Sequence, residues 1–197
     1  MANIVLIPRN NGKIWICIDY HDLNTAFPKD KFSLPITDVM INNTCDFERM
    51  FFMDGFSGYN QIKMYHEDEK HTSFRTPLGV YCYIVMRFGL KNVSATYQCS
   101  MNAIFHEHIR KIVERYVNAI AVKCHDKGDH LADLKIVFDI MWAHQLKMNP
   151  IKSFLRVDSG KFLGFVVTSK GIHLDPGKIY AVQEMQPLRN LKELRGL

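Results

Sequence analysis

The stretch Phe51–Met64, with the sequence FFMDGFSGYNQIKM, constrains the fold of this chain more than any other segment. An apolar run at Met50–Met53 leads directly into Asp54, and Gly55 and Gly58 follow. This pattern predicts a short buried strand that presents one carboxylate at its end and then turns sharply. Such a carboxylate can be a metal ligand, a general base or a turn cap, and an Asp before Gly favours the turn when taken alone.

Length and composition indicate a globular protein with one domain or two small interleaved ones. The 197 residues are 47% hydrophobic and 12% aromatic, which is enough to build a core. The net charge of +5 permits a nucleic-acid partner, but many proteins without one match it. The five cysteines have no paired spacing and fit reduced thiols of an intracellular protein, in cytoplasm or nucleus. Apolar runs are too short for a signal peptide or a membrane span, so we expect no membrane partner.

Hydrophobic periodicity and turn residues predict mostly extended structure in the first half of the chain. The turn signal Asn10-Asn11-Gly12 favours a hairpin. Glu67–Lys70 fits either a charged turn or a short helix. The other predicted elements are strands at Ile4–Ile7 and Lys13–Tyr20, an extended connector at Pro28–Thr37, a short helix at Ile36–Asn43 with Thr37 as its cap, and a hairpin at Thr72–Met86.

Helices and hairpins alternate in the second half. Asn92 or Ser94 is expected to cap a helix that extends to His108. A second helix, Asp129–His144, is expected to bury a stripe made of Leu131, Leu134, Phe138 and Met141. The remaining predicted elements are two strands within Ile112–Lys123 joined by Asn118-Ala119, a β-rich run at Lys161–Thr168 after a Ser-Gly turn, and a final helix that starts at Asp175-Pro176.

Taken in register from about Leu6 to the C-terminus, these segments resemble the reverse transcriptases of gypsy-type long-terminal-repeat retrotransposons, specifically those of plants. The resemblance implies an α+β fold of the right-hand polymerase kind, with fingers and palm. The antiparallel palm sheet would carry the Asp54 strand and the Tyr116 hairpin, backed by the Asn92–His108 and Asp129–His144 helices. Fingers would span about 1–50 and 66–90, palm about 51–65 and 91–175, and 176–197 would begin a thumb or connection that is cut short.

The same resemblance assigns roles to individual residues. Asp54 would be the catalytic residue that binds Mg²⁺, and Tyr59 would lie under the sugar of the incoming nucleotide. Phe88-Gly89 would face that nucleotide, and Lys152 would lie near its phosphates. The implied partners are an RNA or DNA primer–template and a deoxynucleoside triphosphate. An ordinary core tyrosine and an ordinary surface lysine explain Tyr59 and Lys152 equally well from the residues alone.

The chain departs from the family at the third motif, whose pattern is Tyr-x-Asp-Asp. Here the residues are Tyr116-Val117-Asn118-Ala119, so Asn118 and Ala119 stand where the two carboxylates are expected. Two Mg²⁺ ions about 4 Å apart need several anionic oxygens between them. Glu114 cannot substitute, because four residues of strand separate it from Asn118 by about 13 Å. Family-typical residues are also replaced at Trp15, His21 and Arg87.

We therefore predict a retrotransposon-derived domain whose family activity, template-directed DNA synthesis by two-metal nucleotidyl transfer, is defective in this chain. The alternative is a non-enzymatic nucleic-acid-binding remnant, and an unrelated α+β domain is a third, less favoured, hypothesis. Cys124, His125, Asp129 and His130 lie close together, but their spacing fits no standard zinc site and favours the entry loop of a helix. The sequence leaves the oligomeric state open.

Overall fold

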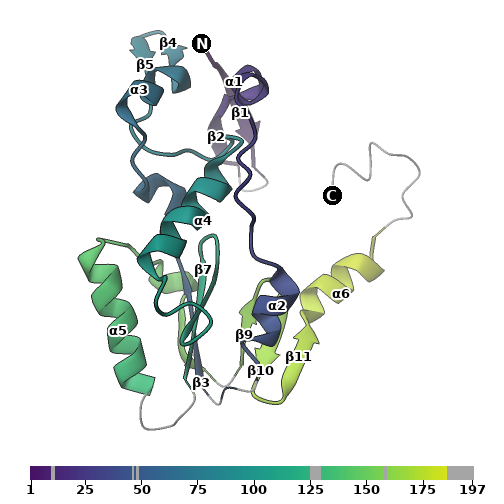
Figure 1. The fold of residues 1–197 in the computed structure, drawn as a ribbon. Coiled ribbons are helices and arrows are strands. Elements are labelled where there is room, and N and C mark those ends of the chain that lie inside the picture. Colours follow the sequence, from purple (N-terminus) through teal and green to yellow (C-terminus); the bar gives the residue numbers. More distant parts are fainter. Residues whose placement is uncertain (10–11, 46, 48, 125–129, 158, 186–197) are drawn as a thin grey trace.

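The computed structural model describes residues 1–9, 12–45, 47, 49–124, 130–157 and 159–185. Figure 1 shows the arrangement of its elements in space. In chain order these are β1 (Asn3–Pro8), β2 (Ile14–Asp19), α1 (His21–Ala26), α2 (Thr37–Asn42), β3 (Arg49–Asp54), η1 (Gly58–Gln61), α3 (His66–Glu69), η2 (Lys70–Thr72), β4 (Phe74–Thr76), β5 (Gly79–Tyr81), α4 (Val93–Ile104), β6 (Val113–Tyr116), β7 (Ala119–Cys124), α5 (His130–Ala143), η3 (Pro150–Lys152), β8 (Phe154–Val157), β9 (Ser159–Phe162), β10 (Phe165–Thr168), β11 (Gly171–Leu174) and α6 (Pro176–Gln183).

An antiparallel sheet with the strand order β6-β7-β3-β8 forms the centre of the fold. β3 pairs with β7 from Arg49 opposite Cys124 to Asp54 opposite Ala119. β6 and β7 form the hairpin that pairs Tyr116 with Ala119. This arrangement confirms the predicted α+β fold, in which one antiparallel sheet carries both the Asp54 strand and the Tyr116 hairpin.

Helices α4 and α5 cover one face of the central sheet (Figure 1). Because side chains alternate along a strand, Phe51 and Met53 of β3 point to this face together with Ile120 and Val122 of β7. The helix side chains that complete this core are Tyr97 and Met101 of α4, Phe105 just after it, and Val137 and Met141 of α5. Burial on this face holds the hairpin tip and the Asp54 strand in fixed register.

The opposite face packs against α2 and the three-stranded sheet β9–β11. Met50 and Phe52 of β3 contact Met40 of α2 and Phe162 of β9 in this second core. The rings of Phe52 and Phe162 lie 5.6 Å apart. Gly160 of β9 leaves room for the Phe52 ring, since an added Cβ would lie 2.3 Å from it. The central sheet is thus covered on both faces, which explains why β3 is an uninterrupted apolar run.

The two N-terminal hairpins are more exposed. β1 and β2 pair over their whole length, and β4 and β5 form a shorter ribbon around Pro77 and Leu78. Both hairpins were predicted, as was the extended connector between α1 and α2. Among the described helices, none is both long and apolar enough to cross a membrane. Cys17, Cys82, Cys99 and Cys124 are free thiols.

Several predicted details of the helices are wrong. Of the stripe predicted for α5, Met141 is buried and Leu134 packs against the core, whereas Leu131 and Phe138 are 65% and 41% exposed. The other buried residues of this helix are His130 and Val137. The predicted stripe followed the most hydrophobic side chains, but the helix is apolar on nearly all sides, so composition did not identify its inner face. Asp129, expected near the start of this helix, lies outside the described residues.

Two predicted caps also differ from the structure. Thr37 is the first residue of α2 instead of its cap, and that position belongs to Ile36. Asn92 precedes α4 without capping it, because its side chain accepts from the Asp30 amide and donates to the Pro28 carbonyl. The helix ends at Ile104, earlier than predicted.

Near the C-terminus, one turn prediction is wrong and one predicted helix start is confirmed. Ser159-Gly160 lies inside β9, and the turn of the β9–β10 hairpin is instead Leu163-Gly164, where both residues have positive φ. The final helix starts at Asp175-Pro176 as predicted, and the Asp175 carboxylate caps it by accepting from the Gly177 amide at 3.1 Å.

Candidate functional site

Asp54 and the turn of the β6–β7 hairpin meet at one end of the central sheet. This turn is Val117-Asn118, one residue earlier than predicted, and Ala119 is the first residue of β7. Asp54 is the register partner of Ala119, and the Gly55 amide donates to the Asn118 carbonyl at 2.9 Å. Paired residues in an antiparallel sheet have Cα atoms about 4.5–5.5 Å apart. The structure therefore confirms that the strand end and the hairpin tip lie side by side, as the family resemblance and the two apolar strands that each end in a turn predicted.

The hairpin tip is held against helix α4 by Gln98, which is fully buried. Its side-chain oxygen accepts from the Val117 amide at 2.8 Å, and its side-chain nitrogen donates to the Arg115 carbonyl. Arg115 in turn donates to the Gln98 carbonyl. Val117 has a φ of 49°, an unusual value for a β-branched residue. These bonds hold a strained hairpin tip beside the end of the Asp54 strand.

Arg115 is only 3% exposed, and its Nε lacks a hydrogen-bond partner within the described part of the chain. Burial lowers the pKa of this guanidinium to about 10, an effect that Tyr97, Cys99 and Glu114 oppose. Sequence analysis missed the exchange between Gln98 and Arg115. The available signal for this exchange was Gln98, a polar residue beside the apolar inner positions Val93, Tyr97 and Met101 of α4.

The residues just before β8 surround Asp54 on its other side. The Asp54 amide donates to Ser153 Oγ, and its carbonyl accepts from the Asn149 amide at 2.8 Å. Lys152 Nζ lies 3.9 Å from Asp54 Oδ2, with side chains 69% and 31% exposed. The structure thus brings together two of the predicted site residues. At this exposure the ion pair contributes little to stability, but it partly neutralises the Asp54 carboxylate.

Asn118 does not act as a substitute carboxylate. Its side-chain oxygen is buried and has no hydrogen-bond partner among the described residues. It lies over Gly58, where an added Cβ would come within 2.0 Å of it. The Tyr97 hydroxyl lies 3.1 Å from the position of an added Cβ at Gly58, and equally 3.1 Å from that of an added Cβ at Gly55. Close packing at the hairpin tip therefore requires glycine at position 58 and leaves little room for a side chain at position 55.

Tyr59 and Tyr97 form an aromatic pair behind Asp54. Their rings meet edge to face at 5.6 Å, and the Tyr59 hydroxyl lies 3.0 Å from Ser94 Oγ. Tyr59 is partly buried against the helix-side core. Burial raises the pKa of Tyr97 to about 12, with Arg115 lowering it and Asp54 raising it further. Asp54 and Tyr97 are thus close enough to interact electrostatically.

Phe88 and Gly89 lie in the loop before α4. Phe88 is 82% exposed, and Gly89 has a φ of 99°, which favours glycine. The Gly89 carbonyl accepts from Asn24 Nδ2 at 2.7 Å, which ties the loop to α1. An added Cβ at Gly89 would lie 3.5 Å from the Tyr20 ring. The loop therefore presents an open aromatic side chain on an anchored backbone.

Two of the residues that differ from the family pattern, Arg87 and Trp15, make contacts with neighbouring side chains. Arg87 donates to the side-chain oxygen of Asn60 and lies 4.5 Å from the Tyr83 ring. Trp15 is 54% exposed, and the Arg9 guanidinium covers its ring at 3.4 Å. Neither contact supplies an anionic ligand.

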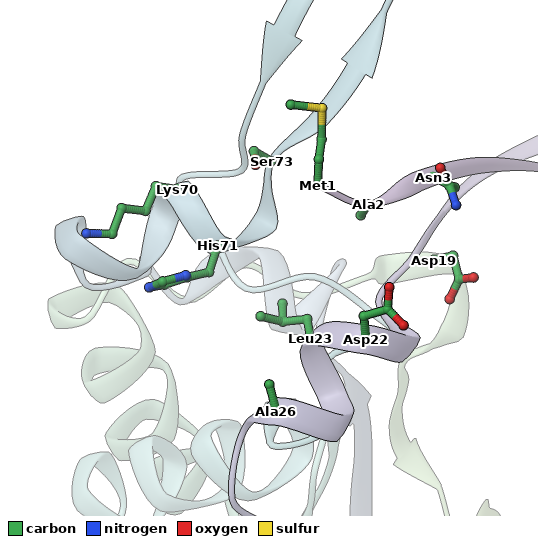
Figure 2. A pocket seen from close by; sticks show the side chains of 10 residues that line it. All are labelled: Met1, Ala2, Asn3, Asp19, Asp22, Leu23, Ala26, Lys70, His71 and Ser73. Carbon is green, nitrogen blue, oxygen red and sulfur yellow. The ribbon is translucent and has the colours of Figure 1, made fainter.

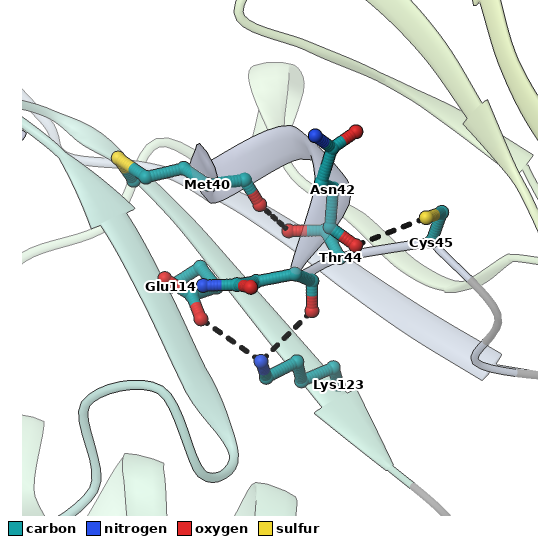
Figure 3. Close-up of polar contacts among 7 residues, drawn as sticks. Met40, Asn42, Thr44, Cys45, Glu114 and Lys123 are labelled. Atoms are coloured by element: carbon teal, nitrogen blue, oxygen red, sulfur yellow. Dashed lines mark hydrogen bonds and ion pairs between the residues drawn. The ribbon is translucent and has the colours of Figure 1, made fainter. Parts of the chain in front are cut away.

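The Glu114 carboxylate is engaged in a buried ion pair away from the hairpin tip. It forms an ion pair with Lys123 at 2.9 Å, and both side chains are 4% exposed. Figure 3 shows this pair beneath the loop that follows α2, where Lys123 also donates to the Asn43 carbonyl at 2.8 Å. This buried pair lies on the face of the sheet opposite α4 and α5. It anchors that loop and confirms that Glu114 does not reach the hairpin tip.

Neither a cavity near the N-terminus nor a cluster of metal-ligating side chains among the described residues points to another site. A cavity of about 330 Å³ lies near the N-terminus, between β1, α1 and η2, and is lined by Asp19, Asp22 and His71 among others (Figure 2). None of its lining residues is a predicted site residue. No group of three or more His, Cys, Asp or Glu side chains converges within the part of the chain that the structure describes. Of the four neighbouring residues Cys124, His125, Asp129 and His130, for which we predicted a helix-entry loop rather than a zinc site, residues 125 and 129 lie outside that part.

Comparison with known proteins gives a consistent family. The family model described as "Reverse transcriptase (RNA-dependent DNA polymerase)" matches residues 7–167. The chain is 32% identical over 190 residues to a retrovirus-related Pol polyprotein from transposon opus of Drosophila melanogaster, covering 95% of this chain. It is 28% identical over 169 residues to the Pol polyprotein from transposon gypsy of the same fly, covering 86% of this chain. The chain spans only 19% and 16% of the lengths of these two relatives.

Solved structures with the same fold include foamy viral protease–reverse transcriptases. One, in complex with double-stranded DNA, has a TM-score of 0.86 at 21% identity and covers 99% of this chain and 34% of its own. Another, in complex with an RNA/DNA hybrid, has a TM-score of 0.85 at 20% identity, covering 99% of this chain and 26% of its own. At these identities the likeness establishes the fold alone.

Proposed function

The chain belongs to the reverse transcriptase family, and from that premise we propose that it is a polymerase-fold domain that holds a primer–template but does not extend it. The family's activity is template-directed DNA synthesis, and the family generally uses divalent metal ions. In this proposal the fingers comprise about 1–50 and 66–90, and the palm about 51–65 and 91–175. Asp54 is the remaining catalytic and metal-binding residue.

One observation carries the proposal: of the three aligned positions at the end of the central sheet, only Asp54 is acidic. Its register partner Ala119 has no side-chain ligand, and the Asn118 oxygen lies over Gly58. The Lys152 ammonium at 3.9 Å offsets part of the remaining negative charge. Two Mg²⁺ ions need several hard anionic ligands at tight distances. The residues present do not fit a two-metal site, so we derive no catalytic step through one.

The nucleotide-binding face is better retained than the metal site. We assign nucleotide contacts to Tyr59, Phe88, Gly89 and Lys152. Phe88 projects from an anchored loop with most of its surface available, which suits stacking against a base or sugar. Lys152 offers an ammonium group beside Asp54, which suits a phosphate. The basic net charge of +5 supports a polyanionic partner such as a primer–template.

Fluorescence anisotropy with a labelled primer–template tests this proposal. We expect binding that weakens linearly in a plot of log affinity against log salt concentration. A labelled deoxynucleoside triphosphate should bind more weakly to Phe88→Ala than to the unmodified chain. Leu78→Ala is the matched control, since Leu78 is 88% exposed and lies in the β4–β5 turn. Absence of primer–template binding at low salt would contradict the proposal.

A further inference from the structure

The solvent-facing side of α5 is unusually apolar for a surface helix. Val137 is 0% exposed and marks the inner face of α5. The exposed residues of this helix are Leu131, Ala132, Lys135, Ile136, Phe138, Asp139, Trp142 and Ala143, of which six are apolar. Trp142 is 87% exposed and Leu131 is 65% exposed. We call these eight residues the outer face of α5. A surface helix normally carries charged and polar side chains on such a face.

This outer face is not covered by another described element. Figure 1 shows α5 at the edge of the molecule, with α4 and the central sheet on its inner side only. Because α5 is apolar around most of its circumference, its composition resembles that of a helix buried on both sides. Contiguous apolar surface of this kind typically marks a protein–protein contact.

The outer face is complementary to itself when a second copy packs antiparallel to it. At 100° per residue, the centre of this face lies directly opposite Val137. A two-fold axis through that centre places Lys135 of one copy opposite Asp139 of the other. The same axis places Leu131 of one copy beside Trp142 of the other on one flank of the pair, and Ala132 beside Ala143 on the other flank, so that apolar side chains meet at both ends of the contact.

We propose that two copies of this chain associate through the outer face of α5 as an antiparallel, two-fold symmetric helix pair. The Lys135–Asp139 pair within one helix, at 2.5 Å and well exposed, becomes a four-charge cluster across the axis. A single helix face of this length buries about 500 Å² per copy, below the roughly 800 Å² of a standard stable interface. The dimer is therefore weak, with a dissociation constant on the order of 10–100 µM. This association is independent of nucleic-acid binding by the chain.

Sedimentation of the unmodified chain from about 5 to about 200 µM tests this interface, with a concentration-dependent monomer–dimer equilibrium as the expected result. Trp142→Glu should weaken dimerisation by at least about ten-fold, because the axis repeats the loss in both copies. Leu78→Glu, an exposed apolar residue far from α5 in sequence, is the matched control and should leave the equilibrium unchanged. Circular dichroism checks that each variant is folded.

Charge reversal gives the sharpest test. Lys135→Glu and Asp139→Lys should each be monomeric, because like charges then face each other across the axis. A mixture of the two variants should form a heterodimer, because their charges are again opposite. A chain that stays monomeric at about 200 µM, where a weak interface is populated, would overturn the proposal. So would a dimer that Trp142→Glu and both charge reversals leave intact.

Discussion

Restoring both carboxylates of the hairpin tip should make the metal-free protein less stable. Asn118→Asp and Ala119→Asp together place two negative charges beside Asp54, whose register partner is Ala119. Directly opposed side chains have Cβ atoms about 4.5–5.5 Å apart. Two unit charges about 5 Å apart repel by about 3 kcal/mol at an effective dielectric constant of about 20. The Asp54 side chain is 31% exposed, so screening reduces the expected loss to about 1–3 kcal/mol.

This loss should depend on pH and on metal in a defined direction. Mutual repulsion raises the pKa of at least one carboxyl in the folded state above its unfolded value. The destabilisation is therefore present at pH 7 and disappears as the pH falls below both pKa values. A divalent ion that binds only the folded state stabilises it by about 1.4 kcal/mol when the ion concentration is about ten times its dissociation constant.

Urea denaturation followed by circular dichroism measures both effects. The unmodified chain and the double variant are compared in a chelator and in excess MgCl₂, at pH 7 and near pH 4. The double variant carrying Asp54→Ala as well is the control, because it removes one charge and should recover part of the stability without metal. Equal stability of the two proteins in chelator, with no response of the double variant to Mg²⁺, would refute the reasoning.

Three further predictions concern the packing that positions the site, and urea denaturation checks each. Glu114→Gln should cost about 3–5 kcal/mol, because it leaves the Lys123 ammonium buried without its counter-ion, whereas replacing both residues by Met should cost much less; equal losses would contradict this. Gly58→Ala should cost about 1–3 kcal/mol, since its methyl group would lie 2.0 Å from the Asn118 oxygen, and Asn118→Ala should relieve that loss. Val117→Gly should stabilise the chain by about 0.5–1 kcal/mol, because glycine removes the strain of a φ of 49°, and a loss of stability would show that the valine side chain matters more.

The arrangement of the site could be predicted because local patterns agreed with one another. The apolar run before Asp54 and the two apolar strands around Asn118 each end in a turn, so a shared sheet brings their ends together. The covering helices were also predicted, because α4 carries a regular stripe that includes Tyr97 and Met101. Hydrophobic period predicted the individual strands and helices, and the family resemblance placed the Asp54 strand and the Tyr116 hairpin in one sheet.

Other features depend on contacts that hydrophobic patterning does not encode. Glu114 and Arg115 are both buried in β6, one paired with Lys123 and the other packed against Gln98. A strand pattern assigns charged residues to the solvent, so it cannot locate a buried ion pair formed across strands. The prediction of the inner face of α5 was wrong because apolar residues such as Leu131 also occupy its outer face. Hydrophobicity alone therefore did not distinguish the two faces. The family resemblance placed Lys152 near the nucleotide phosphates, but the contact between Lys152 and Asp54 was not predicted.

Extension of a labelled primer on an RNA template most directly tests the claim that this polymerase-fold domain lacks a working metal site. The reaction contains the unmodified chain, all four deoxynucleoside triphosphates and either Mg²⁺ or Mn²⁺, and Asp54→Ala is the matched control. With one carboxylate at the end of the sheet, we expect no template-dependent product above that control. Template-dependent extension by the unmodified chain that is lost in Asp54→Ala would contradict the account.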